Sequence, residues 1–285
     1  MKKTFCFLLK TTFILILLLV FQNNTTYAFS PSDFGVVDLK FSDFHIENKL
    51  SDVEKEMLVD AFTLYSMGKQ VDAVNLCTKG IARFPSRPTF YIFRAYFNML
   101  IKDSQDAYYY GGKLELNDLS KAISLDPNFT FYAYYFRAWC YLKNINYRQL
   151  SVDKNYLNTI NSNINNANLD INKFYDEGTK FAKSIGEDYY NKIAYMYCHL
   201  AINCIDRRLY SEQLKMKMNS NYLPQYDYIK KQYNTMVALV QQYNSYDQRL
   251  NPLLTNGKDI QTLLIKIKKY WNFWVTIICF KWINT

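Results

Sequence analysis

Glycine and proline are scarce in this chain of 285 residues, which contains 8 and 6 of them, and no long run alternates apolar with polar residues. Folds built from β-strands and tight turns depend on these features, so their scarcity argues against a sheet protein. The composition and the pattern together predict an all-α fold.

Histidine is scarcer still, because His45 and His199 are the only two. A histidine-bound metal or a Ser–His relay would need one of them with suitable partners. His45 lies in a leader segment and His199 lies beside the apolar face of a helix, which favours structural or solvated roles. The motifs H-E-x-x-H and G-x-S-x-G are absent, and Gly112-Lys113 lacks the flanking residues of a phosphate-binding loop. We therefore expect no enzyme, with no catalytic residue, metal or cofactor.

The excess of positive charge is confined to the two ends of the chain. The formal net charge is +9, of which residues 1–28 carry +3 and residues 258–285 carry +4, so +2 remains for the body. Nucleic-acid-binding proteins concentrate positive charge on one face. The nearly balanced body therefore argues against nucleic acid as a partner.

The first residues have the layout of a secretory signal. Lys2 and Lys3 precede an apolar run over 13–21, and Thr26-Tyr-Ala28 provides a small-x-small cleavage site. We expect residues 1–28 to be a signal peptide and the protein to be exported to the periplasm, the cell surface or the medium. A retained N-terminal anchor is the alternative.

Residues 29–52 form a predicted leader segment that contains Ser-Pro-Ser, Gly35 and short apolar pairs. We interpret the leader as a strand-like arm that lies along the first repeat. The pattern Ser-Asp-Val-Glu that begins at Ser51 resembles a capping box, so it predicts that a helix starts there.

Six helices are predicted after the leader, and they pair into three hairpins. The pairs are 54–67 with 70–83, 88–102 with 113–125, and 130–143 with 147–160. Part of the second hairpin recurs in the third, where Tyr91-Ile-Phe93-Arg94-Ala95-Tyr96 returns as Tyr134-Tyr-Phe136-Arg137-Ala138-Trp139. Such self-similarity indicates stacked supersecondary units.

These hairpins resemble tetratricopeptide repeats, which place small residues where two helices approach closely and a proline at the end of a unit. The matching positions are Ala61, Gly68, Ala73, Gly80 and Pro85 in the first hairpin, Tyr91, Ala95, Ala122 and Pro127 in the second, and Tyr134, Ala138, Tyr141 and Tyr147 in the third. The resemblance implies an α-solenoid of three to four hairpins, with the repeats over residues 53–165.

Residues 166–250 are predicted to form a C-terminal helical extension. The helices expected there cover 171–185, 188–207 and 225–246, and the Asn-rich stretch 158–168 before them is interpreted as a loop or a frayed helix end. The extension is either a degenerate fourth repeat or a cap on the open end of the array.

The tail over residues 251–285 is basic and aromatic. Its apolar core of about ten residues is too short to span a membrane, but lysines beside tryptophans suit a membrane interface. The candidate interface residues are Trp271, Trp274, Trp282, Lys268 and Lys269. A tail that docks on the array, and an aberrant C-terminus from a shifted reading frame, are the alternatives.

The resemblance also implies a binding surface, because the first helix of each such unit lines the concave face of the array. It puts six large side chains on or near that face: Phe62, Tyr65, Ile92, Tyr96, Tyr135 and Trp139. Large rings with polar tips bury much area and lose little entropy, which suits a peptide-binding groove. Ordinary packing is the alternative, because aromatic residues make up 18% of the chain. Arg94 and Arg137 either bind acidic groups of a partner or form salt bridges between adjacent units.

We therefore expect a non-enzymatic protein–protein interaction module of the cell envelope or the extracellular space, which binds a peptide or protein segment on its concave face. The alternative is a membrane-peripheral structural protein that is attached through its Trp- and Lys-rich tail. Neither interpretation identifies the partner.

Overall fold

The computed structural model describes residues 39–105, 112–126, 131–145, 155–219, 222 and 225–243. The chain divides into two compact units, Met1–Gly35 and Val36–Thr285, and all of the described residues belong to the second unit. The predicted signal peptide at 1–28 and the predicted tail at 251–285, with its candidate membrane-interface residues, lie outside the described residues.

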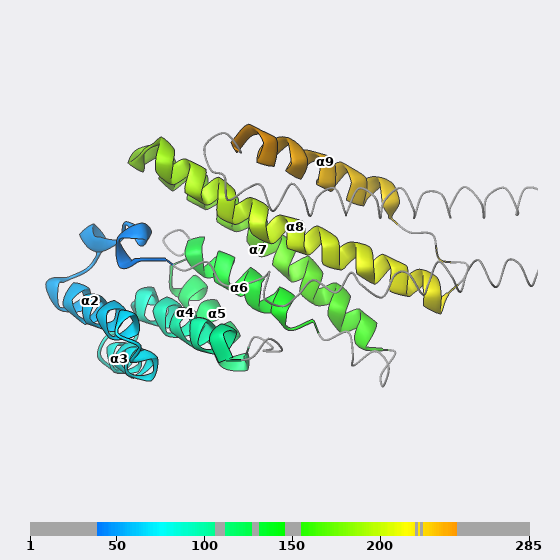
Figure 1. Cartoon of the computed structure of the whole chain (residues 1–285). Coiled ribbons are helices and arrows are strands. Elements are labelled where there is room, and N and C mark those ends of the chain that lie inside the picture. The colour runs from blue at the N-terminus through cyan, green and yellow to red at the C-terminus, as the bar shows by residue number, and fades with distance from the viewer. Residues whose placement is uncertain are drawn as a thin grey trace, which may run out of the picture. The chain divides into compact units, whose positions relative to one another are not determined.

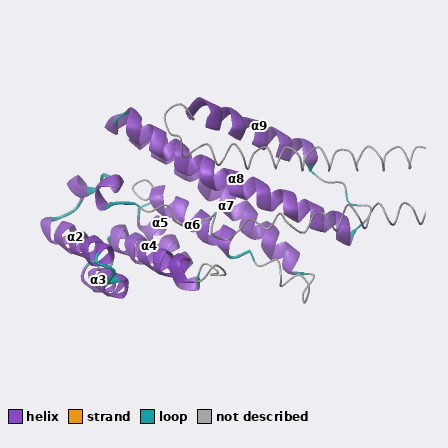
Figure 2. Cartoon of the chain, in the orientation of Figure 1, coloured by secondary structure: helices purple, strands orange, loops and turns teal. Residues whose placement is uncertain are grey.

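The described residues form helices joined by short connections, and none of them forms a strand (Figure 2). Two 3-10 helices come first, η2 (Phe41–Phe44) and η3 (Glu47–Lys49). The α-helices that follow are α2 (Asp52–Ser66), α3 (Gln70–Arg83), α4 (Pro88–Gln105), α5 (Lys113–Leu125), α6 (Phe131–Lys143), α7 (Tyr156–Ile185), α8 (Glu187–Met218) and α9 (Tyr226–Tyr243). The predicted all-α fold class is confirmed.

Each of these α-helices packs against the next one along the chain, from α2 against α3 to α8 against α9 (Figure 1). Contacts also join α4 to α6 and α6 to α8, which are the first helices of neighbouring hairpins. Packing of each unit mainly against its sequence neighbours is the solenoid-like arrangement that the hairpin pattern predicts.

Local signals in the sequence place several helix ends. Ser51 caps α2: its side chain accepts a hydrogen bond from the backbone N–H of Glu54, and the Glu54 carboxylate accepts one from the N–H of Ser51. This is the predicted capping box. Gly68 has a φ of 75°, a conformation that glycine adopts without steric cost, and it makes the turn between α2 and α3.

The prediction of two separate helices over residues 147–185 is wrong. The Asn-rich stretch 158–168, expected to be a loop or a frayed end, lies inside α7, a single helix that also contains the predicted helix 171–185. The reason is a buried apolar stripe at helical spacing, formed by Ile160, Ile164, Ala167 and Ile171. Burial of this stripe outweighs the weak helix propensity of asparagine.

The leader also differs from the prediction, because its described part contains the 3-10 helices η2 and η3 in place of a strand-like arm. His45 connects them with a φ of 50°, the left-handed region that a non-glycine residue adopts at a cost. The expected position along the first hairpin agrees with the structure, since η2 contacts α2.

The alanines predicted at helix contacts are buried, whereas Gly68 in the turn is exposed. Ala61, Ala73, Ala95, Ala122 and Ala138 are each completely inaccessible to solvent. Gly80 in α3 faces α4 so closely that an added Cβ would lie 2.2 Å from a ring carbon of Phe90. Short side chains therefore allow the helices to approach, as the pattern required.

Candidate functional site

Residues 39–50, which we call the strap, lie beside α2 (Figure 1), and their side chains contact α2, α4 and α6. The central anchor is Phe44, whose side chain is only 2% exposed. Its ring contacts five aromatic rings from three helices, with centroid distances of 4.6 Å to 6.5 Å: Phe62 in α2, Phe93 and Tyr96 in α4, and Tyr132 and Phe136 in α6. One strap residue therefore joins three hairpins.

Other apolar strap residues extend this contact on both sides of the anchor. Phe41 lies 5.5 Å from Phe62 and 6.3 Å from Phe93, measured between ring centroids. Leu39 and Ile46 are buried as well. The strap thus inserts side chains at 39, 41, 44 and 46 into the fold, while Ser42 between them is exposed.

Two tyrosine hydroxyls bind the main chain of the strap. Tyr96 Oη accepts a hydrogen bond from the backbone N–H of Leu39 (2.6 Å) and donates one to the carbonyl oxygen of the same residue (3.2 Å). Tyr132 Oη donates to the carbonyl oxygen of Asp43 (3.0 Å) and lies 3.0 Å from Tyr189 Oη. Burial raises the pKa of Tyr132 well above its usual value, so the hydroxyl keeps its proton and stays a donor.

Polar and charged contacts connect the strap to α7 and α8. Asp43 forms an ion pair with Lys192 in α8 at 2.7 Å, and both side chains are about a quarter exposed. The ring of His45 lies 4.6 Å from that of Tyr189. The Lys49 ammonium lies 5.3 Å from the ring centroid of Phe181 in α7, within the range of a cation–π interaction.

We define the strap-binding face by the side chains that make these contacts, namely Phe62, Phe93, Tyr96, Tyr132, Phe136, Phe181, Tyr189 and Lys192. The face is mostly aromatic, carries hydroxyls that reach a bound main chain, and includes the cation Lys192, which pairs with Asp43. This chemistry suits an extended segment with apolar anchors and an acidic residue.

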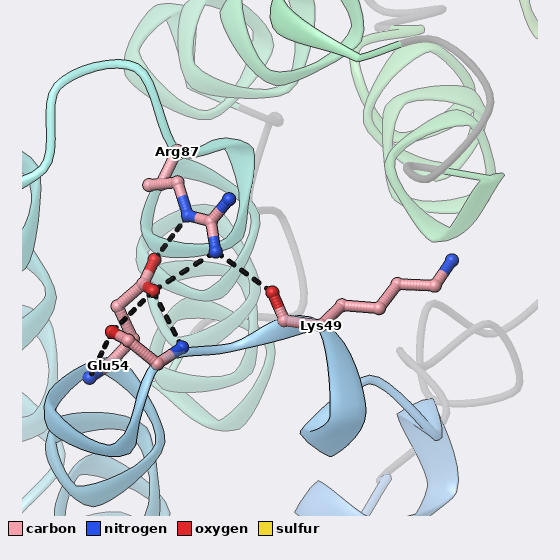
Figure 3. A network of polar contacts seen from close by, with 4 residues as sticks. Lys49, Glu54 and Arg87 are labelled. Carbon is pink, nitrogen blue, oxygen red and sulfur yellow. Dashed lines mark hydrogen bonds and ion pairs between the residues drawn. The ribbon is translucent and has the colours of Figure 1, made fainter.

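A polar network fixes the point where the strap joins α2 (Figure 3). Arg87 donates from Nη2 to the carbonyl oxygen of Lys49 (2.8 Å) and to the Glu54 carboxylate (3.1 Å), and its Nε also donates to Glu54. Ser51 donates to the same carboxylate from its N–H and its hydroxyl. Burial alone would raise the pKa of Glu54, but the bonds from Arg87 and Ser51 outweigh it and lower this pKa to about 2.

The predicted aromatic ladder is only partly on this face. Phe62 and Tyr96 belong to it, and Tyr65 stacks on Phe97 at its edge, with ring centroids 5.4 Å apart. Tyr96 is fully buried, because the strap covers it. The predicted open ladder is therefore, in this structure, a covered surface.

The remaining members of the ladder are packing residues. Ile92, Tyr135 and Trp139 are buried, and the Tyr135 ring packs 5.1 Å from Phe174 of α7. Since α6 contacts both α7 and α8, the rings at 135 and 139 are enclosed, and no open surface presents them. For these positions the structure shows the packing alternative.

The recurring arginines form salt bridges within the molecule, and the two predicted alternatives were a partner's acidic groups and salt bridges between adjacent units. Arg94 binds the Asp118 carboxylate in α5 with two hydrogen bonds of 2.6 Å and 2.7 Å. Its Nη1 lies 3.5 Å from the Thr78 hydroxyl in α3. The ion pair therefore lies within one hairpin, contrary to the predicted salt bridge between units, and the weak bond to Thr78 reaches the preceding unit.

Arg137 repeats this arrangement one hairpin later. It binds Asp170 of α7 at 2.7 Å and 2.8 Å, and its Nη1 donates to the Ser120 hydroxyl of α5 at 3.2 Å. Both arginines thus connect the second helix of their own hairpin to the second helix of the preceding one. Neither points a free guanidinium at the strap-binding face.

Sequence reasoning did not identify Phe44, Tyr132, Tyr189 or Lys192 as site residues. A usable signal existed only for Phe93 and Phe136, which occupy equivalent places in the recurring segment and both face Phe44.

Comparison with known proteins gives no assignment: no family model, no curated protein and no solved structure matches this chain. Among the residues that the structure describes, no helix is both long enough and apolar enough to cross a membrane.

Proposed function

We propose that this protein is a non-enzymatic helical-repeat module that binds an extended segment of a protein chain on its strap-binding face. The predicted signal peptide at 1–28 makes the cell envelope or the extracellular space the proposed location. The observation that carries the proposal is that the face already holds such a segment, residues 39–50, through apolar anchors and main-chain hydrogen bonds.

Two properties of the face suit recognition in trans. Its rings offer a large apolar area with few rotatable bonds, so little conformational entropy is lost when a ligand binds. Its tyrosine hydroxyls bind backbone N–H and C=O groups, which every peptide carries. The first property supplies affinity, and the second orients an extended main chain without requiring a particular side chain.

The test measures binding of a synthetic peptide to the full chain carrying Phe44→Ala, which weakens the strap and makes the face accessible. A fluorescein-labelled peptide with the sequence of residues 39–50 is titrated by fluorescence anisotropy. We expect saturable binding, weakened at least tenfold by a further Phe62→Ala, because Phe62 contacts two strap rings.

Val71→Ala in the same background is the matched control, since Val71 is 65% exposed on α3 and makes none of the strap contacts. Absence of saturable binding, or equal loss in the Phe62→Ala and Val71→Ala chains, would refute the proposed function.

A further inference from the structure

We infer that the strap is an internal competitor for this site, and that the partner carries the strap's own pattern of anchors and must displace it. This inference rests on the proposed function and adds the identity of the ligand class and its regulation. In the strap the pattern begins with an aliphatic residue and has an aromatic residue two positions after it. An acidic residue and a phenylalanine follow four and five positions after the first residue, and a second aliphatic residue follows seven positions after it. These residues are Leu39, Phe41, Asp43, Phe44 and Ile46.

Four of the five positions have an identified counterpart on the face, and Ile46 is buried. The phenylalanine of the pair enters the cluster of five rings, and the earlier aromatic residue packs on Phe62 and Phe93. The residue at position 39 is bound through its backbone by Tyr96, and the acid pairs with Lys192. A partner segment without a ring at the position of Phe44 would leave a cavity among the five rings. This position should therefore discriminate most strongly between partner segments.

The way the strap is attached suits its displacement by a partner. It is attached by side-chain contacts and by the hydrogen bonds of Tyr96, Tyr132 and Arg87, and its own structure consists of two 3-10 helices of four and three residues. At its centre, His45 is the non-glycine residue with positive φ among the described residues, so the bound conformation carries a local cost that departure would relieve. The helices beneath also contact one another directly along the chain.

An internal occupant lowers the apparent affinity of any partner in a calculable way. The apparent dissociation constant equals the intrinsic one divided by the fraction of molecules whose face is open. If the strap occupies the face in about 99% of molecules, a partner binds about 100-fold more weakly than to an open face. Only a partner that reproduces most of the strap's contacts, or one present at high concentration, would then bind.

Lys192 supplies a specificity element of the face, because it pairs with the residue next to Phe44. Its side chain is about a quarter exposed and its ammonium pairs with Asp43 of the strap, so displacement of the strap leaves this cation facing the incoming segment. An acidic residue at the equivalent place restores the pair, whereas a neutral one leaves Lys192 partly desolvated without a counter-charge. The partner is therefore an acidic–aromatic peptide segment.

The experiment titrates the labelled 39–50 peptide into four full-length chains: the wild type, Phe41→Ala, Phe44→Ala and Ser42→Ala. Phe44 makes five ring contacts and Phe41 makes two, whereas Ser42 is exposed. We expect Phe44→Ala to bind at least tenfold more tightly than the wild type, Phe41→Ala to be intermediate, and Ser42→Ala to equal the wild type. Circular dichroism checks that each chain is folded. If Phe44→Ala does not fold, the comparison of the milder Phe41→Ala with the wild type still decides the test.

A second arm tests the charge. An Asp43→Asn change in the peptide is expected to weaken binding several-fold to a chain with Lys192 and to have no effect on a Lys192→Ala chain. An equal loss in both chains would overturn the acidic element of the pattern.

The outcomes separate this inference from the proposed function. Equal affinity of the peptide for the wild type, Phe41→Ala and Phe44→Ala would overturn the competition while leaving the binding function intact. No binding to any chain would remove both. A concentration-dependent dimer of the wild type that Phe44→Ala abolishes, seen by size-exclusion chromatography with light scattering, would assign the face to the strap of a second copy and overturn the external partner.

Discussion

Gly80→Ala tests whether α3 and α4 approach so closely that only a residue without a side chain fits between them. A Cβ added at Gly80 would lie 2.2 Å from Cδ1 and 2.4 Å from Cε1 of Phe90. Carbon atoms in ordinary contact lie about 3.5–4.0 Å apart, so the ring or the helix must shift by more than 1 Å. Phe90 is completely buried and stacks on Phe84 with centroids 5.8 Å apart, which leaves it little room.

Two opposing terms set the magnitude. Insertion of a methyl group into a packed core costs about 1–3 kcal/mol in strain, whereas alanine in place of glycine inside a helix stabilises it by roughly 0.5–1 kcal/mol. The Cβ added at Gly80 would overlap strongly with the rigid ring of Phe90, so we expect a strain energy in the upper half of this range. The expected net effect is a loss of about 1–2.5 kcal/mol in the free energy of unfolding.

Urea denaturation of the full chain, followed by circular dichroism at 222 nm, measures this loss. Gly178→Ala is the matched control, because an added Cβ there would lie 3.0 Å from Cγ2 of Ile193 and needs a much smaller adjustment. A double-mutant cycle with Phe90→Ala isolates the clash: without the ring, Gly80→Ala is expected to stabilise by up to about 1 kcal/mol. If Gly80→Ala stabilises the chain equally with and without the ring, the close approach of α3 and α4 is refuted.

Two further predictions concern the ion pairs. The pKa of Glu54 is lowered from 4.5 to about 2, so its pair with Arg87 stabilises the fold fully above pH 4.5, and this contribution falls as pH drops toward 2. Because Arg87 is 43% exposed, we expect about 1–2 kcal/mol, and Glu54→Gln should flatten the unfolding free energy against pH in that window. Arg137→Ala should cost about 3 kcal/mol in urea denaturation, since it leaves the buried Asp170 carboxylate unpaired, and Asp170→Asn in the same chain should recover part of it.

The helical hairpins were predictable because local signals mark them. The bounds of α3 and α5 agree with the predicted 70–83 and 113–125, where apolar periodicity coincides with an end signal such as Gly68 before α3 or Gly112 before α5. Such signals depend on neighbouring residues alone, so one sequence suffices to read them. Their agreement with the structure shows that propensity and packing favour the same conformation there.

Where propensity and packing conflict, the prediction failed. Residues 158–168 contain several asparagines, which favour turns, yet Ile160 and Ile164 are buried inside α7. Their burial against neighbouring helices is a tertiary effect, which the local composition does not report. The same reason explains why the predicted helix at 147–160 has wrong bounds: its described part belongs to the start of α7, which continues to Ile185.

The candidate site was predictable only in part, because the strap reaches it by contacts that are distant in sequence. The hydrogen bond between Tyr96 and Leu39 joins residues 57 positions apart, and that between Tyr132 and Asp43 joins residues 89 positions apart. No periodicity or local motif encodes such pairs. The sequence therefore indicated an aromatic face from Phe62 to Tyr96 but not the segment that covers it.

The recurring segment explains how one pattern builds both the scaffold and the site. Arg94 ties its own hairpin to the preceding one, the alanine after it lets helices approach, and Phe93 turns to Phe44 of the strap. The two copies differ at their last position, where Tyr96 binds the strap main chain and Trp139 is enclosed among helices. The copies are alike at the phenylalanine that contacts Phe44 and differ at this last position, so the main-chain bonds to Leu39 depend on where the repeat has diverged. A Tyr96→Phe chain should therefore keep its helix packing while losing the main-chain bonds that hold Leu39.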